Sequence, residues 1–149
     1  LEASILLYYT GASRSSAEII DEQKKNTSQG NNRAVEAMHR IKQNAINMKE
    51  ALLKGDISSF ARILGQGWED KKAMASAISN PVIEEAMERA VQAGAITGKV
   101  SGAGGGGFII FAVEPTKRLQ GKRALNQLDG NIVEFQFSEG GTHGWKIFH

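Results

Sequence analysis

Cysteine is absent from this chain of 149 residues, and proline occurs only twice. Without cysteine, the chain can form neither a disulfide framework nor a thiolate metal site. No apolar run approaches the roughly 20 residues that a transmembrane helix needs, and aromatic residues make up only 7% of the sequence. These absences argue against a disulfide-stapled fold, a membrane partner and a surface that stacks nucleic-acid bases.

Charge of one sign is also scarce, because 18 Lys and Arg residues nearly balance 16 Asp and Glu residues. Basic pairs such as Lys24-Lys25 and Lys122-Arg123 are scattered along the chain with acidic residues between them. This pattern is typical of a solvated surface, so we expect no nucleic-acid partner. The length and the 41% of hydrophobic residues predict one domain with its own core.

Glycine, in contrast, is concentrated at one place. The stretch TGKVSGAGGGGFIIFAV, residues 97–113, has five glycines among the six residues Gly102 to Gly107. A flexible linker is one interpretation, but linkers usually have polar neighbours. Here strand-like segments lie on both sides, and this favours a tight connection between two strands.

Such a loop can turn backbone N–H groups toward an anion, because no side chain stands in the way. The spacing matches neither G-x-x-x-x-G-K-[ST] nor a G-x-G-x-x-G that opens a helix. Pattern alone therefore gives only weak support for phosphate binding.

The remaining elements follow from periodicity and from helix-terminal residues. A strand is expected at 4–9, and a helix capped by Ser15 or Ser16 should follow it. Further helices are expected over 34–52 and over 115–127. Another should begin at the Asp56 N-cap and continue through Trp68, with a weak point at Gly65 and Gly67. A fourth is expected from Asn80-Pro81 to Gly94. The other strands are expected at 96–100, 108–113, 131–137 and 144–148.

This order, β-α-α-α-α-β-β-α-β-β, mixes hairpins with helical returns. It predicts an α+β fold in which several helices pack on one face of a mainly antiparallel sheet.

The stretch GKVSGAGGGGFIIF resembles the third, C-terminal motif of the GHMP small-molecule kinases. Two further stretches, YYTGASRSSAEII and ISNPVIEEAMERAVQAGAITGKVSGAGGGG, are similar to the sugar-phosphate branch of this family. The resemblance covers nearly the whole chain in the right order. It implies a ferredoxin-like C-terminal domain over residues 1–149.

The resemblance implies an enzyme of two domains. The N-terminal domain would hold ATP under a glycine-serine loop. No P-x-x-G-L-G-S-S-A stretch is present here, so we expect a C-terminal half without a catalytic residue of its own. The resemblance implies ATP and Mg²⁺, held mainly by an N-terminal domain, a cytoplasmic location and a sugar-phosphate substrate. Heptose 7-phosphate is the expected substrate, with a fucokinase-type sugar kinase as the alternative.

The resemblance also implies the site residues. The glycine motif, which should lie near the substrate and the phosphate loop of the other domain, comprises Ser101, Gly102, Ala103, Gly104, Gly105, Gly106 and Gly107. Thr10, Arg14 and Ser16 are expected to bind the substrate, because the arginine fork suits phosphate or hydroxyl groups. Taken without the resemblance, Arg14 is more simply a solvated loop residue.

Three histidines, His39, His143 and His149, are too dispersed for a metal site. Lys99 could reach an anion, although an edge-strand lysine is an equally good interpretation. A non-catalytic ligand-binding or dimerisation module is the alternative function, because folds of this class host many functions.

Overall fold

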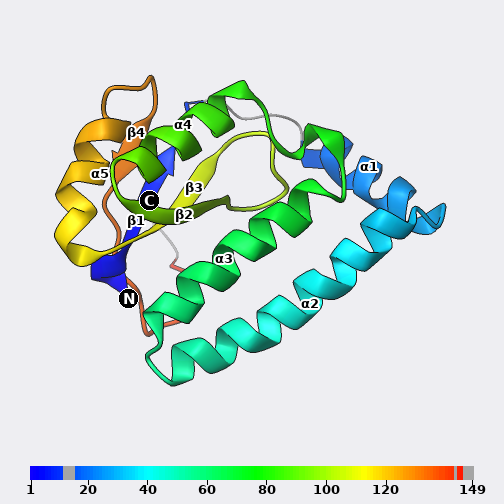
Figure 1. Ribbon diagram of the computed structural model, residues 1–149, viewed down its shortest axis with the longest axis horizontal. Coiled ribbons are helices and arrows are strands. Elements are labelled where there is room, and N and C mark those ends of the chain that lie inside the picture. Colours follow the sequence, from blue (N-terminus) through cyan, green and yellow to red (C-terminus); the bar gives the residue numbers. More distant parts are fainter. Residues whose placement is uncertain (12–15, 143, 146–149) are drawn as a thin grey trace.

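The structure is a computed structural model that describes residues 1–11, 16–142 and 144–145. Within these ranges it contains five α-helices and four strands (Figure 1). Their bounds are β1 Ile5–Tyr9, α1 Ser16–Ser28, α2 Asn32–Leu53, α3 Ile57–Lys72, α4 Pro81–Gln92, β2 Ala95–Val100, β3 Phe108–Val113, α5 Arg118–Leu125 and β4 Asn131–Val133. Single 3₁₀ turns, η1 to η3, lie at Glu2–Ser4, Ser76–Ile78 and Pro115–Lys117. None of the described helices is both long and apolar enough to span a membrane.

The strands form one antiparallel sheet in the order β2-β3-β1-β4. The strand β1 lies inside the sheet, where Tyr8 pairs with Ile109 of β3 and Leu7 pairs with Val133 of β4. Every neighbouring pair is antiparallel, so the predicted α+β fold with a mainly antiparallel sheet is confirmed.

The two faces of the sheet bury different sets of side chains. Successive side chains of a strand point to opposite faces, and Leu6 and Ile5 accordingly enter different cores. The larger core includes Leu6, Tyr8, Ile109 and Phe111 of the sheet, Ile83 and Met87 of α4, and Leu125 of α5. The smaller core includes Ile5, Ala112, and Phe60, Ala61 and Leu64 of α3. The helices are thus shared between the two faces rather than gathered on one.

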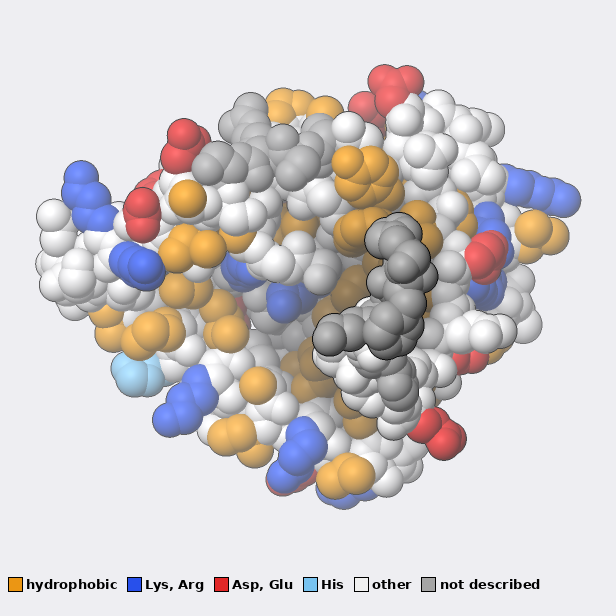
Figure 2. All heavy atoms as spheres, turned by 180° about the vertical axis from the view of Figure 1, so that it is seen from behind, with side chains coloured by type: hydrophobic (Ala, Val, Ile, Leu, Met, Phe, Trp, Pro, Cys, Tyr) orange, Lys and Arg blue, Asp and Glu red, His pale blue; other side chains and the backbone are white. Residues whose placement is uncertain are grey.

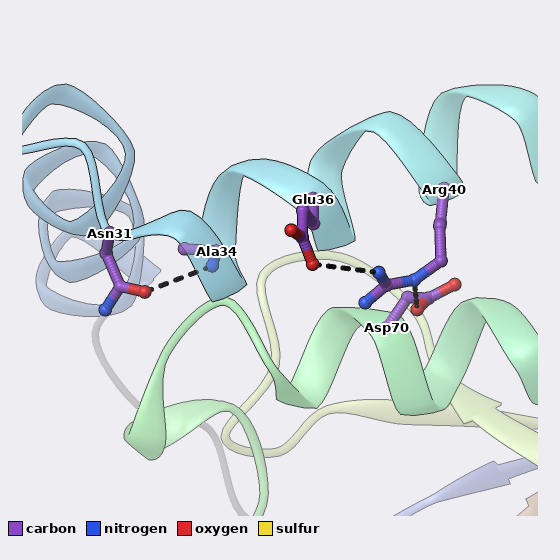
Figure 3. Close-up of polar contacts among 5 residues, drawn as sticks. All are labelled: Asn31, Ala34, Glu36, Arg40 and Asp70. Atoms are coloured by element: carbon purple, nitrogen blue, oxygen red, sulfur yellow. Dashed lines mark hydrogen bonds and ion pairs between the residues drawn. The ribbon is translucent and has the colours of Figure 1, made fainter.

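Helices α2 and α3 lie side by side as an antiparallel hairpin (Figures 1 and 3). Asn31 caps α2, and its side chain accepts a hydrogen bond from the backbone N–H of Ala34 at 3.3 Å. Farther along, Arg40 of α2 reaches Asp70 of α3 at 2.5 Å and Glu36 of its own helix at 3.8 Å. Asp70 is mostly buried, so this ion pair ties the two helices together.

Helix α3 runs through Gly65 and Gly67 without a break and continues to Lys72. A Cβ atom at Gly65 would lie 2.6 Å from the hydroxyl oxygen of Thr97 in β2. Gly65 therefore permits the close approach of α3 to the sheet, and the expected weak point of the helix is a packing position.

The strand expected at 131–137 is shorter than predicted. β4 ends at Val133, although Phe135 and Phe137 continue the alternating pattern. The backbone N–H of Phe137 instead donates to the carboxylate of Glu2 at 2.6 Å. Pairing stops because this segment bonds to the chain before β1 and not to the strand ladder.

The prediction of a strand at 144–148 is wrong for the two residues of this range that the structure describes. Gly144 and Trp145 are described and lie in no strand, and residues 146–148 lie outside the described residues.

Candidate functional site

The glycine loop, residues 101–107, connects β2 to β3 and has an unusual backbone. The φ angle is positive at Gly102 (84°), Gly104 (118°), Gly105 (73°), Gly106 (150°) and Gly107 (82°). At Gly104 there is also a steric reason for glycine, because a Cβ atom would lie 2.8 Å from the carbonyl oxygen of Ile78. The composition of the loop thus follows from its conformation and from its contact with η2.

Backbone hydrogen bonds fix the loop at both ends and in the middle. At the ends, the N–H of Ser101 donates to Phe108 at 2.8 Å, and the N–H of Thr10 donates to the carbonyl of Gly107 at 2.9 Å. In the middle, the N–H of Gly105 donates to the carbonyl of Ile78 at 2.8 Å. These bonds support the interpretation as a tight connection between strands and exclude a free linker.

Side chains from two helices and from the N-cap of α4 also bind the loop carbonyls. The Nδ2 of Asn80 donates to Gly105 at 3.0 Å, the Nζ of Lys71 donates to Gly102, and Gln23 of α1 approaches Ala103 at 3.5 Å. With these carbonyls directed at the protein, the N–H groups of Gly104, Gly106 and Gly107 donate to no other described residue. Free N–H groups in a concave backbone suit an oxyanion.

Two of the three predicted substrate residues lie beside the loop. Ser16, at the start of α1, lines a cavity of about 190 Å³ together with every residue of the predicted glycine motif except Gly105. Thr10, which follows β1, lines a neighbouring cavity of about 220 Å³ with Asn80, Gly105 and Gly106. Arg14 lies outside the described residues, so its predicted place in the site has no structural counterpart here.

A third cavity, of about 270 Å³, continues from Thr10 toward the loop before β4. Its lining is mixed, and the polar residues in it include Tyr8, Glu85 and Asp129. The Tyr8 hydroxyl accepts a hydrogen bond from the backbone N–H of Gly130 at 3.0 Å. Burial raises the pKa of this phenol, the Gly130 bond lowers it, and the negative charges of Asp129 and Glu85 raise it. The phenol is therefore a neutral group with a hydrogen to donate.

The sequence interpretation missed the residues that hold the loop from outside it. Asn80 was recognised only as an N-cap, and its Oδ1 does accept from the N–H of Ile83 at 3.1 Å. Its Nδ2 has the second role of holding Gly105. The asparagine gave a local signal, whereas Lys71 and Gln23 gave none, because their partners lie 31 and 80 positions away in sequence.

No group of three or more His, Asp or Glu side chains that could hold a metal ion occurs among the described residues. His39 is exposed on α2. His143 and His149 lie outside the described residues.

Comparison with known proteins adds to this geometry. The profile of the family described as GHMP kinases C terminal matches residues 48–130. D-glycero-alpha-D-manno-heptose 7-phosphate kinase of Campylobacter jejuni is 42% identical over 147 residues, which are 99% of this chain and 43% of that protein. L-fucokinase/L-fucose-1-P guanylyltransferase of Bacteroides fragilis is 28% identical over 141 residues, which are 91% of this chain and 15% of that protein.

Among solved structures, a candidate sugar kinase from Campylobacter jejuni superposes with a TM-score of 0.67 at 39% identity, over 99% of this chain and 40% of that one. The chain thus spans less than half of the length of the relatives that it matches. The family match includes α3, α4, the glycine loop and β3, which are the elements that build the loop and its anchors. The chain belongs to the GHMP kinase family and corresponds to its C-terminal domain.

Proposed function

We propose that this chain is the substrate-side domain of an ATP-dependent kinase that phosphorylates the anomeric hydroxyl of D-glycero-D-manno-heptose 7-phosphate. The observation that carries the proposal is the 42% identity to a heptose 7-phosphate kinase over 99% of the chain. The fucokinase relative is more distant, at 28% identity.

In this proposal the glycine loop approaches the transferring phosphoryl group. Catalysis of phosphoryl transfer depends mostly on positioning and on donors aimed at the phosphoryl oxygens. The free N–H groups of Gly104, Gly106 and Gly107 suit that role. Thr10 and Ser16 approach the loop from either side and would orient the sugar, and Arg14 remains a prediction from sequence for its phosphate.

ATP and Mg²⁺ would be held mainly by a preceding domain. The described residues include no cluster of carboxylates that could bind the metal, and none of those that line the two cavities beside the glycine loop is an Asp, Glu or His. The proposal therefore places no catalytic residue in this chain and requires an N-terminal domain as its partner. We infer a cytoplasmic location for the same protein, because it would draw on the ATP pool.

The test is made on the protein encoded by the complete reading frame. ADP release is measured with ATP, Mg²⁺ and either heptose 7-phosphate or L-fucose. We expect kcat/KM for heptose 7-phosphate to exceed that for L-fucose by about 100-fold or more, because charge-assisted bonds to the 7-phosphate have no counterpart in fucose. A preference for L-fucose would favour the alternative sugar kinase.

The non-catalytic module makes a different prediction. A start codon directly before Leu1, with no ATP-binding domain upstream, would overturn the kinase proposal. Within the kinase, Arg14→Lys should raise KM for heptose 7-phosphate by about 10- to 150-fold and leave KM for ATP unchanged, since lysine keeps the charge but loses the bidentate fork.

A further inference from the structure

A separate cavity of about 270 Å³ lies between α2, α3 and β2, next to the glycine loop but lined by none of its residues. Most of its wall is apolar, and the contributing side chains include Ile41, Met48, Leu64 and Met74. The face shown in Figure 2 has a central hollow where Lys or Arg side chains lie among hydrophobic ones. A cavity of this size is just below the usual range of ligand pockets, about 300–1,000 Å³, and suits a small molecule.

Two lysines enter this cavity from different elements. Lys71 comes from α3 and Lys99 from β2, and both are half-buried. Burial, followed by the positive charge of Lys99, lowers the pKa of the Lys71 ammonium. None of the described residues that line the cavity carries a carboxylate. The two positive charges therefore face the same space without an acidic partner there.

The two ammonium groups differ in what they bind. Lys71 donates to the carbonyl of Gly102 and so has one polar partner. The ammonium group of Lys99 makes no hydrogen bond or ion pair with any described residue. Like charges held together in a partly desolvated site are unfavourable unless an anion offsets them.

We propose that this cavity binds a phosphate monoester with a small apolar body, whose dianionic head lies between Lys71 and Lys99. Two unit charges match a dianion better than they match a carboxylate. The apolar body would lie against Met48, Met74 and Ile41. No residue of the glycine loop lines this cavity, and the proposal does not depend on the chain being part of a kinase.

The four methionines of the chain provide the readout. Met48 and Met74 line the cavity, whereas Met38 and Met87 do not. The 149-residue chain is labelled with ¹³C at the methionine methyl groups and titrated by NMR at pH 8 with phenyl phosphate, inorganic phosphate and phenol. We expect phenyl phosphate to shift the signals of Met48 and Met74 and not those of Met38 and Met87.

Phenyl phosphate combines the charged head and the apolar body, so its Kd should be lower by about tenfold or more than that of either inorganic phosphate or phenol. Equal affinity for phenyl phosphate and inorganic phosphate would show a site for the head alone and would overturn the proposal. The absence of shifts at Met48 and Met74 at millimolar phenyl phosphate would also overturn it.

Lys99→Gln tests the head group without touching the bond from Lys71 to the glycine loop. This substitution should raise the Kd of phenyl phosphate by about 10- to 100-fold, as expected for the loss of a charge-assisted hydrogen bond. Lys49→Gln is the matched control, because Lys49 is exposed on α2 next to Met48 and does not line the cavity. Equal weakening by both variants would indicate general attraction by net charge and would contradict the site. The unliganded spectrum of each variant checks that it is folded.

Discussion

The glycine loop and the segment after β4, residues 134–142, both lack regular secondary structure, but they are held very differently. Bonds with Thr10, α3, η2 and Asn80 fix the loop over most of its length. The later segment has few such partners, and Phe137 within it is 57% exposed. Irregular backbone is thus well defined where distant elements supply donors and acceptors, and this is what a site requires.

If the contact with η2 holds the glycine loop, a side chain that pushes the loop away from η2 should have the largest effect on stability. Gly104→Ala should lower the free energy of unfolding by about 2–5 kcal/mol. The positive φ costs about 1–2 kcal/mol, and the overlap with Ile78 adds about 1–3 kcal/mol. Urea denaturation of the chain measures the change.

Gly102→Ala is the control for the cost of the positive φ angle alone. Its φ is also positive, at 84°, but nothing lies within 4 Å of the added Cβ. We expect a loss of only about 1–2 kcal/mol. If the two variants lose equal stability, the contact of the loop with Ile78 contributes nothing.

Asn80 allows the anchor to be separated from the helix cap. Asn80→Ala removes both roles and should cost about 1.5–2.5 kcal/mol, whereas Asn31→Ala removes a cap alone and should cost about 1 kcal/mol. Asn80→Asp keeps an oxygen for the N–H of Ile83 but loses the donor to Gly105. It should retain the cap and lose about 0.5–1.5 kcal/mol of stability with the bond to Gly105, and in the complete kinase it should lower kcat. A stability equal to that of the unchanged chain would contradict the second role of Asn80.

Much of the fold could be predicted from the sequence, because its signals are local. Asn31, Asp56 and Asn80 each precede a periodic apolar segment, and each accepts a hydrogen bond from the third residue after it. The short apolar runs at 4–9 and 108–113 likewise predicted strands. β4 was overestimated because the alternation at Phe135 and Phe137 shows propensity but not whether a partner strand is within reach.

The site was predicted less completely. The glycine motif, Thr10 and Ser16 share one region, and the resemblance to a family drew attention to them. The side chains that hold the loop, such as Lys71 and Gln23, lie in helices where each is an ordinary polar residue. Only the packing of α1 and α3 around the loop brings them to it, and no local pattern encodes that arrangement.

Lowering the pH should weaken the hydrogen bonds that join α1 to η2. The Glu22 carboxylate of α1 accepts hydrogen bonds from the N–H and hydroxyl of Ser76, at 2.8 and 2.9 Å, and from the N–H of Ala77 at 3.4 Å. The Ser76 bonds, chiefly that of its backbone N–H, lower the pKa of Glu22 below the ordinary value of 4.5. Because the folded-state pKa is depressed, the stabilisation is complete above pH 4.5 and is lost as pH falls through the folded value.

Glu22→Gln should therefore flatten the dependence of stability on pH below 4.5 and reduce stability slightly at pH 7. Thermal unfolding followed at several pH values checks this. Glu18→Gln is the control, since Glu18 is exposed on the same helix. The same flattening in both variants would mean that Glu22 has no special part in acid sensitivity.

The smallest effect is expected in the segment after β4. Phe137→Ser should change the free energy of unfolding by less than about 0.5 kcal/mol, because exposed side chains contribute little. Phe108 is the matched residue: it is 40% exposed and contacts Tyr9 with ring centroids 5.2 Å apart, as Phe137 contacts Phe135 at 5.5 Å. Phe108, however, is paired within β3, so Phe108→Ser should cost about 1 kcal/mol through lost cross-strand packing. If Phe137→Ser costs as much as Phe108→Ser, the segment after β4 is held as firmly as the sheet, and the contrast with the glycine loop fails.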